Sequence, residues 1–189
     1  MSRIWLTSDT HFGHDREFLY SPRGFQSIWE HDQQIIKNWN EVVSPDDDIF
    51  LLGDCMLGDN YYGLSCLKQL KGNIHIIRGN HCTDTRMELY NTCYNVVEIC
   101  EGKFLKACGR YFYLCHYPTI VSNFDDDKPL KAKMTSICGH SHTKDKFQDM
   151  DKGIIYHVEL DAHGNYPVLI DTVIEDIQEY TKQKKGIKQ

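Results

Sequence analysis

Short apolar runs followed at once by polar residues are the main pattern of the first half of the chain. Residues 4–7, 49–52 and 74–77 are apolar runs rich in β-branched and large side chains, which predicts buried strands. Apolar residues recur at helical spacing over residues 28–43, and leucines do so over 64–70, which predicts a helix between each pair of strands. This alternation of strand and helix predicts parallel strands joined by right-handed crossovers.

The ends of these helices carry residues that start and stop helices. Ser27 and Glu30 have the spacing of a capping box, and Pro45 follows where the first helix should stop. Gly72 is expected to cap the second helix at its C-terminus. The stretch from residue 15 to 26 is expected to be irregular, because it contains a Ser-Pro-Arg-Gly turn signal.

The second half of the chain has shorter and more closely spaced elements. After a short helix at 84–90, we expect a group of strands that pair antiparallel. These predicted strands are residues 96–99, 104–107 and 111–115. A tight turn with Gly109 at its first central position and Arg110 next is expected to join the last two.

Three further strands and a terminal helix are expected near the C-terminus. The strands are residues 135–138, 154–160 and 167–170. Residues 118–133 are expected to form a loop with an exposed acidic run. Thr172 and Glu175 have capping-box spacing, which predicts a helix to about Tyr180 and then a polar, frayed tail over 182–189.

Side chains that can bind metal follow several of the predicted strands directly. These clusters are Asp9-x-His11, Gly53-Asp54, Gly79-Asn80-His81, the single His116, and Gly139-His140-Ser141-His142. Ligands of open α/β sheets bind beyond the carboxyl ends of the strands, so we expect the clusters to meet there. Turn and capping chemistry is the alternative explanation for any one cluster, but packing alone does not explain five.

The candidate ligands combine carboxylate, imidazole and amide groups. They are Asp9, His11, Asp54, Asn80, His116, His140 and His142. This mixture suits Mn²⁺, which we favour, and also Fe²⁺, Ni²⁺ or Zn²⁺, better than Mg²⁺ or Ca²⁺. Seven ligands exceed the three or four of one catalytic zinc ion. The set therefore predicts two divalent ions about 3.5–4 Å apart that share a carboxylate.

Composition narrows the classes of function. The chain of 189 residues has a net charge of −6, which argues against extended binding to nucleic acid. Its 41% hydrophobic and 25% charged residues are ordinary for a globular protein, so we expect one domain over residues 1–189. The eight cysteines have no C-x-x-C spacing. With no signal peptide or transmembrane run expected, we predict a cytoplasmic protein with reduced thiols and no membrane contact. The oligomeric state is left open.

The order of the motifs resembles that of the calcineurin-like metallophosphoesterase superfamily: D-x-H, G-D, G-N-H, a single His and G-H-x-H over residues 9–142. Longer segments resemble a small bacterial and phage-type subfamily. These segments are residues 7–14, 38–40, 45–47, 77–81, 115–118 and 158–163. The resemblance implies an α/β fold in which two mixed β-sheets pack face to face as a sandwich flanked by helices.

The resemblance also implies a role for each motif residue. Asp9, His11 and His142 would hold one ion, Asn80, His116 and His140 the other, and Asp54 would bridge them. A water or hydroxide between the ions would be the nucleophile. His81 would be the catalytic residue that faces the substrate and stabilises the phosphorane charge or protonates the leaving oxygen. His14 and Asn80 are candidate substrate contacts.

The chain departs from the family pattern at one position. Members usually carry an acidic residue after the G-N-H histidine, where this chain has Cys82. Either Asp84 supplies the missing carboxylate, or His81 works without one and favours substrates with good leaving groups.

Other polar and aromatic residues are expected to be structural. Arg78 should pair with a carboxylate, and both Trp29 and Trp39 should lie in the core of the first long helix. The remaining histidines should be packed or on the surface: His31, His75, His157 and His163. Cysteines beside the motifs should fill small apolar spaces: Cys55, Cys82, Cys115 and Cys138. Asp161 fits either a family position or a turn.

The function predicted from the sequence is metal-dependent hydrolysis of a small phosphodiester or nucleotide-like phosphoester. A phosphomonoesterase or pyrophosphatase with the same metals is an alternative, because the motifs do not encode the leaving group. A nuclease and a non-catalytic metal-binding scaffold that recruits partners are two further alternatives. The acidic net charge argues against the nuclease, and the complete ligand set argues against the scaffold.

Overall fold

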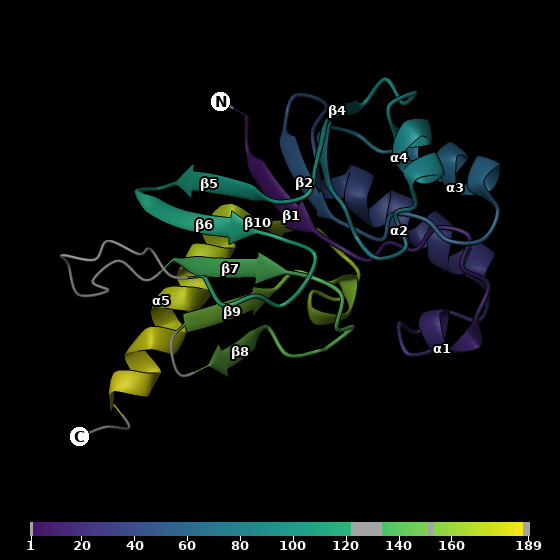
Figure 1. The fold of residues 1–189 in the computed structure, drawn as a ribbon. Helices are drawn as coiled ribbons and strands as arrows, with labels where there is room; N and C mark the ends of the chain where they lie inside the picture. Colours follow the sequence, from purple (N-terminus) through teal and green to yellow (C-terminus); the bar gives the residue numbers. More distant parts are fainter. Residues whose placement is uncertain (1, 122–133, 151–152, 187–189) are drawn as a thin grey trace.

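Two mixed sheets form the centre of the protein in the computed structural model, which describes residues 2–121, 134–150 and 153–186 (Figure 1). Within these residues each sheet has five strands, in the orders β10-β1-β2-β3-β4 and β5-β6-β7-β9-β8. The sheets pack face to face with helices outside, so the predicted α/β sandwich is confirmed.

The first sheet contains the predicted β-α-β-α-β unit. Its strands are β1 (Ile4–Thr7), β2 (Asp48–Leu52), β3 (Asn73–Ile77), β4 (Val96–Cys100) and β10 (Val168–Leu169). Strands β1 to β4 are parallel, and β10 adds antiparallel to β1. The parallel register brings the carboxyl ends of β1, β2 and β3 to one edge. We had expected residues 96–99 to join an antiparallel group, which is wrong, because β4 extends this parallel sheet.

Three helices cover the outer face of the first sheet: α2 (Ile28–Val42), α3 (Asn60–Leu67) and α4 (Asp84–Tyr90). The side chain of Ser27 accepts a hydrogen bond from the backbone N–H of Glu30, as the capping box predicts. Trp39 is fully buried against the sheet, as expected. Trp29 is 66% exposed, so the prediction that it lies in the core is wrong. Helix α3 is capped at Lys68 rather than at Gly72.

The second sheet mixes parallel and antiparallel pairs. Its strands are β5 (Lys103–Ala107), β6 (Arg110–Leu114), β7 (Thr135–Cys138), β8 (Phe147–Met150) and β9 (Gly153–His157). The β5–β6 and β8–β9 pairs are antiparallel, while β6, β7 and β9 run parallel, which corrects the expected all-antiparallel half. The hairpin turn places Cys108 and Gly109 at its centre, with φ of 48° and 74°, so the predicted turn is wrong by one residue.

Several boundaries near the ends of the chain also differ from the prediction. A short helix α1 (Glu17–Tyr20) lies in the stretch expected to be irregular. Helix α5 (Ile170–Gly186) begins before Thr172 and continues beyond residue 182, so neither the second capping box nor the early frayed tail is present. A 3₁₀ turn over Leu160–Ala162 ends the region predicted as one strand at 154–160. Most of the predicted loop at 118–133 lies outside the described residues.

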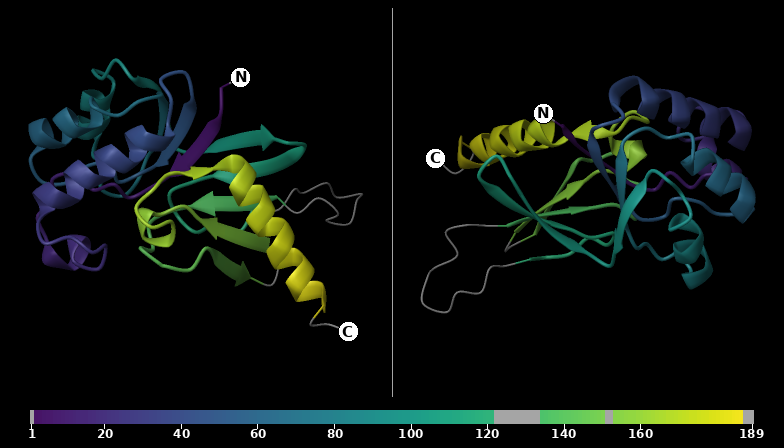
Figure 2. Two further views of the ribbon diagram at one scale, coloured as in Figure 1. Left: turned by 180° about the vertical axis from the view of Figure 1, so that it is seen from behind. Right: turned by 90° about the horizontal axis from the view of Figure 1, so that it is seen from above.

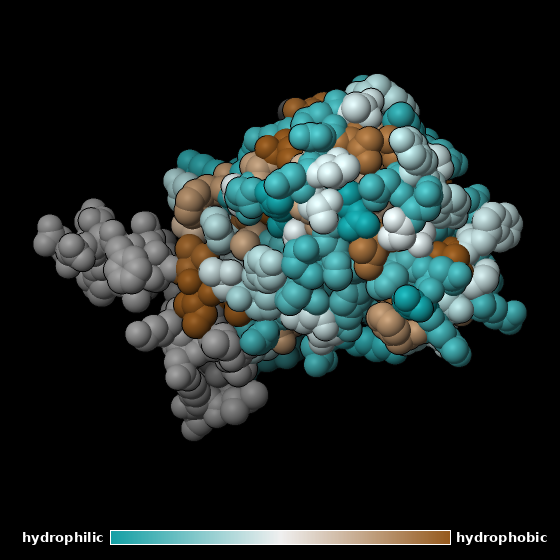
Figure 3. Space-filling view, turned by 45° about the vertical axis from the view of Figure 1, so that its right-hand side comes forward, coloured by the Kyte–Doolittle hydropathy of each residue, from teal (hydrophilic) through white to brown (hydrophobic). Residues whose placement is uncertain are grey.

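The core has two layers, separated by the first sheet. One layer packs helix side chains against its outer face, and the other joins its inner face to the second sheet and to α5. Helix α5 lies along the side of the sandwich, where it contacts β1 and β10 (Figure 2). On the face drawn in Figure 3 hydrophilic residues predominate, and hydrophobic residues form small separate patches. Among the described helices, none combines the length and the apolar character that a membrane span requires.

Candidate metal centre

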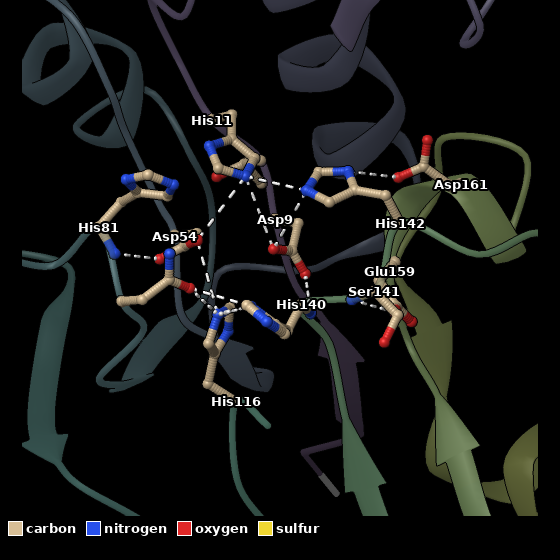
Figure 4. Close-up of polar contacts among 12 residues, drawn as sticks. Asp9, His11, Asp54, His81, His116, His140, Ser141, His142, Glu159 and Asp161 are labelled. Carbon is tan, nitrogen blue, oxygen red and sulfur yellow. Dashed lines mark hydrogen bonds and ion pairs between the residues drawn. The ribbon is translucent and has the colours of Figure 1, made fainter. Parts of the chain in front are cut away.

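The seven predicted ligands come together beyond the carboxyl ends of the strands (Figure 4). Asp9 and His11 follow β1, Asp54 follows β2, and Asn80 follows β3 in the first sheet. The other three follow strands of the second sheet: His116 after β6, and His140 and His142 after β7. The site therefore lies where the loops of both sheets meet.

One group of ligands consists of Asp9, His11 and His142. The Oδ1 atom of Asp9 lies 3.6 Å from Nε2 of His11 and 3.6 Å from Nε2 of His142. The two Nε2 atoms are 3.2 Å apart. Oδ1 of Asp9 is buried and has no hydrogen-bond partner among the described residues. Such an orphaned carboxylate oxygen facing two imidazoles fits a cation between them.

A second group consists of Asn80, His116 and His140. Oδ1 of Asn80 lies 2.8 Å from Nε2 of His116 and 3.0 Å from Nδ1 of His140. Nδ1 of His116 donates to the carbonyl oxygen of Leu52 at 2.8 Å. In the neutral ring this leaves a lone pair on Nε2, which points at the amide oxygen of Asn80. Two acceptors directed at each other again fit an intervening cation.

Asp54 lies between the two groups. Its Oδ2 atom is 3.5 Å from Nε2 of His116 and 3.8 Å from Nε2 of His11. Asp9, which belongs to the first group, also lies close to the second. Asp9, Asp54 and His116 each have a donor atom, and these three atoms lie within 4.8 Å of one another. The donor atoms of Asp9, His11 and His142 meet the same limit. The structure therefore contains two adjacent groups of donor atoms that could hold a cation, and both groups include Asp9.

Backbone amides orient both carboxylates. The second oxygen of Asp9, Oδ2, accepts from the backbone N–H of His140 at 2.9 Å. Oδ1 of Asp54 accepts from the backbone N–H of His81 at 2.9 Å. Each carboxylate thus has one oxygen fixed by the main chain of another loop and one oxygen directed at the histidines. This arrangement preorganises the free oxygens as ligands.

The pKa values of Asp9 and His11 favour metal binding, whereas at His142 burial lowers the pKa but the hydrogen bond to Asp161 raises it overall, so a metal ion competes with a proton there. Burial alone raises the pKa of Asp9, but the nearby ring of His11 lowers the pKa overall, below its usual range. Burial lowers the pKa of His11, so its imidazole is mostly neutral near pH 7. Burial alone raises the pKa of Asp161, but His142 and Arg23 lower it by more, so the net pKa is below its usual range and this carboxyl is ionised. Deprotonated carboxylates and neutral imidazoles are the forms that bind divalent metal.

The backbone is strained where the ligands lie. Seven non-glycine residues among those described have positive φ, and five of them are predicted ligands: Asp9, His11, Asp54, His140 and His142. Their φ values lie between 47° and 74°, in the left-handed region that costs most residues energy. Strain of about 1–3 kcal/mol per residue is typical of functional sites, where surrounding contacts hold it in place.

Two glycines let the loops approach closely enough to form the site. A Cβ atom on Gly79 would lie 2.3 Å from Oδ1 of Asp54, and one on Gly139 would lie 2.4 Å from Oδ2 of Asp9. Any side chain at these positions would displace a predicted ligand. The glycines of the G-N-H and G-H-x-H motifs are therefore required by space rather than by turn geometry.

A buried arginine that the sequence did not identify holds the first group in place. Arg23 donates to both oxygens of Asp161, at 3.1 and 2.7 Å, and to the carbonyl oxygen of Asp9 at 3.0 Å. Oδ2 of Asp161 lies 3.3 Å from Nδ1 of His142 and can accept its proton, which leaves Nε2 free as a ligand. Of the two interpretations of Asp161, the structure therefore favours a position in the site.

The same network continues through the first long helix. The second guanidinium nitrogen of Arg23, Nη1, lies 3.0 Å from Nε2 of His31, and Nδ1 of His31 lies 2.7 Å from Oδ1 of Asp32. The other oxygen of Asp32 accepts from the backbone N–H of Gly13 at 2.9 Å. His31 is thus packed, as expected, but it is packed as part of a chain of hydrogen bonds that supports the loop after β1.

A second support lies beneath the G-H-x-H loop. Glu159 is fully buried, and its Oε1 accepts from the backbone N–H of Ser141 at 3.2 Å. The same oxygen lies 3.0 Å from Nδ1 of His157, which is also buried. A carboxylate so far from solvent requires these partners, so Glu159 fixes the loop that carries His140 and His142.

The predicted catalytic histidine, His81, lies beside the candidate ligands, but its ring forms none of the close contacts that join those ligands to one another. The ring of His81 stands edge-on to His11, with centroids 5.6 Å apart. Among the described residues no carboxylate bonds to its ring. Asp84 instead pairs with Arg78, which confirms the pairing expected for Arg78, so of the two alternatives for His81 the structure favours the one without an acidic partner. Cys82 is buried in the core near Cys55 and Tyr90.

The remaining candidates have simpler positions. His14 lies near His11, with ring centroids 5.4 Å apart, and burial lowers the pKa of His14 to about 4. His75 lies on the sheet between Asp48 and Glu98, away from the site. Cys55, Cys82 and Cys138 are buried and Cys115 is partly buried, as expected for residues that fill small spaces.

Known proteins resemble the chain in sequence and in fold. The model of the calcineurin-like phosphoesterase superfamily domain matches residues 2–158. The gene 66 protein of Mycobacterium phage L5 is 36% identical over 209 residues, which cover 99% of this chain and 99% of that protein. An uncharacterized protein of Methanocaldococcus jannaschii is 29% identical over 183 residues, which cover 94% of this chain and 93% of that protein. The crystal structure of a protein of unknown function from Aquifex aeolicus has the same fold, with a TM-score of 0.66 and 20% sequence identity. The match covers 93% of this chain and 99% of that chain.

Proposed function

Because the chain belongs to the calcineurin-like phosphoesterase superfamily, we propose that it hydrolyses a small phosphodiester with two divalent metal ions as cofactors. We place one ion among Asp9, His11 and His142 and the other among Asn80, His116 and His140, with Asp54 between them. Residues 1–189 would form one catalytic domain. Mn²⁺ is the favoured ion because the donors mix oxygen and nitrogen.

The observation that carries this proposal is the convergence of acceptors. Oδ1 of Asp9 faces two imidazole nitrogens, and the lone pair of His116 faces the amide oxygen of Asn80 at 2.8 Å. Oδ1 of Asp9 is buried without a hydrogen-bond partner among the described residues, which costs free energy that a bound cation would recover. The same pattern at two neighbouring positions supports two ions rather than one.

The chemistry follows from how the residues are held. Bound divalent ions would polarise the phosphoryl group and lower the pKa of water. The backbone amides of His81 and His140 keep the carboxylates of Asp54 and Asp9 oriented, so little reorganisation is needed. The ring of His81 lies at the edge of the cluster, where it can donate a proton to the leaving oxygen or stabilise charge on phosphorus.

A screen of metals and model substrates tests the proposal. The purified protein would be loaded with Mn²⁺, Ni²⁺, Zn²⁺ or Mg²⁺ and assayed on bis-p-nitrophenyl phosphate and p-nitrophenyl phosphate. We expect about two ions per chain by elemental analysis and faster cleavage of the diester. Faster cleavage of the monoester would favour the phosphomonoesterase alternative, and metal binding without any hydrolysis would favour the scaffold.

A matched pair of histidine variants controls this experiment. His140→Ala removes a predicted ligand, whereas His75→Ala removes a histidine that pairs with Asp48 and Glu98 on the sheet. We expect metal loss only in the first variant. Equal metal content in both would contradict the proposed site.

A further inference from the structure

The cavity beside the metal centre has two chemically different halves. It has a volume of about 510 Å³, within the range of sites that hold small organic ligands. One half is lined by His11, His81 and His142, which belong to the cluster described above. The lining also includes four apolar side chains, referred to below as the apolar half: Phe18, Leu19, Pro22 and Leu57. His14 and Asp161 complete the lining.

The apolar half is built by a separate, well-anchored element. Phe18 and Leu19 lie on α1, which contacts α2, and Pro22 follows in the next turn. Leu19 is buried, and the adjacent Arg23 is fixed by the hydrogen bonds to Asp161, so this wall is held firmly. Figure 1 shows α1 outside the two sheets, at the side where α2 lies. A short element added beside a catalytic centre points to substrate selection rather than to support of the core.

Phe18 is the feature that the fold itself does not explain. Its side chain is 72% exposed, while Leu19 beside it supplies the buried contact of α1. The Phe18 ring stands edge-on to His14 with centroids 5.6 Å apart, and His14 in turn lies 5.4 Å from His11. An exposed aromatic ring on a cavity wall offers an apolar and stacking surface to a ligand.

Apart from the ring of His14, which contacts Phe18, the polar groups of the cavity offer little to bind a charged or sugar-like group at the apolar wall. Among its described lining residues there is neither lysine nor arginine, so a second phosphate would meet no cation there. The carboxylate of Asp161 accepts two bonds from Arg23 and is only 8% exposed, which leaves little capacity for a hydroxyl. The wall therefore complements an apolar ring.

We propose that this cavity binds an aromatic ester group of the substrate, with its ring against Phe18 and Leu57 and its phosphoryl group at the metal centre. The inference rests on the proposed phosphodiesterase function and narrows its substrate to aryl-type or base-bearing diesters. It disfavours pyrophosphate and polyphosphate substrates, which carry a second charge instead of a ring.

A pair of diester ligands tests the inference. Binding of diphenyl phosphate and dimethyl phosphate to the Mn²⁺-loaded protein would be measured by calorimetry, for the unmodified protein and for Phe18→Ala. We expect tighter binding of diphenyl phosphate, weakened about 2- to 10-fold by Phe18→Ala, because an aromatic contact has about that effect. Dimethyl phosphate binding and metal content should not change, and Phe18→Trp should keep the preference.

Phe104→Ala is the matched control. Phe104 is also an exposed phenylalanine, at 66%, but it lies on β5 and does not line the cavity. This variant should bind both diesters like the unmodified protein. Equal affinity for the two diesters, or an equal loss for both in Phe18→Ala, would overturn the inference.

The two proposals fail in different ways. If the protein binds diphenyl phosphate through Phe18 but cleaves no phosphoester, the proposed function is wrong and the aromatic subsite stands. If it cleaves diesters with no dependence of binding on Phe18, the function stands and the aromatic subsite is wrong.

Discussion

The two halves of the metal centre are held by different kinds of structure. In the Asp9, His11 and His142 half, the backbone N–H of His140 holds one oxygen of Asp9, but the side chains of Arg23 and Asp161 fix the ring of His142 and the loop after β1. In the Asn80, His116 and His140 half, orientation comes mainly from the main chain. There the carbonyl oxygen of Leu52 at the end of β2 fixes His116, whose ring is fully buried.

Because of this difference, the two halves depend on different parts of the structure for their geometry. The main-chain half is as rigid as the sheet that carries it, since its fixed acceptor is part of a central strand. The side-chain half depends on a bond between residues 138 positions apart, so it forms only when the two ends of the chain meet. Substitutions outside the ligands should therefore disturb the first half more than the second.

The largest effect is expected from Asp54→Asn, which removes the carboxylate shared by both halves. Two dications would then lie close together with less negative charge between them, so at least one should be lost. We expect less than two metal ions per chain by elemental analysis and nearly complete loss of diester hydrolysis, with an unchanged circular dichroism spectrum. An active Asp54→Asn protein with both metals would contradict its position between the ions.

The next effect separates binding from catalysis. His140→Ala should lower metal content, whereas His81→Ala should keep the metals and reduce turnover by about 10²–10⁴-fold. The loss in His81→Ala should be greater for an alkyl diester than for a p-nitrophenyl diester, because a poor leaving group needs more protonation. Metal analysis and paired kinetics check this. Equal metal loss in both variants would mean that His81 is itself a ligand.

A pair of arginines tests the side-chain half alone. Arg23→Lys keeps the charge but loses the two-oxygen contact with Asp161, so His142 should be less well oriented. We expect metal affinity about 10- to 100-fold weaker by competition with a chelator, as for other residues that orient a ligand. Arg78→Lys is the control, because Arg78 pairs with exposed Asp84 and Glu101 at the surface. The same affinity in both variants would show that the buried network does not orient the ligands.

The smallest effect is expected at Cys82. Its side chain is buried in the core near Cys55 and Tyr90, and the carboxylate close to it is the predicted ligand Asp54, which bonds to the backbone of His81 and not to its ring. Cys82→Ser should lower the melting temperature by a few degrees, corresponding to about 1 kcal/mol. The ratio of aryl to alkyl diester rates should stay the same. A changed ratio would indicate that residue 82 tunes His81 after all.

The sequence predicted the parallel unit and the ligand positions because both are local signals. An apolar run such as Ile74 to Ile77 predicts its own strand, and the ligands follow such runs directly. The place of β4 was not predictable in this way. Its pattern describes a half-buried strand, and only packing decides which sheet it joins. Strand β8 is short, and two polar residues separate Phe147 from Met150, so its sequence gave no strand signal.

Arg23 was missed for a related reason. It lies in a stretch with strong turn chemistry, where an arginine is normally solvated. Its side chain can be buried because it bonds to Asp161 and His31. The residues next to Arg23 in the sequence identify neither of these partners. The spacing of the candidate ligands predicts a metal site, but the residues that orient those candidates become apparent only in three dimensions.

The pairing of β10 with β1 has a consequence for folding during synthesis. Strand β1 is the first strand of the chain, yet its outer edge pairs with residues 168–169, in the last strand of the described residues. Until that segment leaves the ribosome, the backbone N–H and C=O groups along this edge of β1 have no strand partner. An open edge is a template for pairing between chains, so a slow or paused ribosome should increase aggregation of the nascent protein.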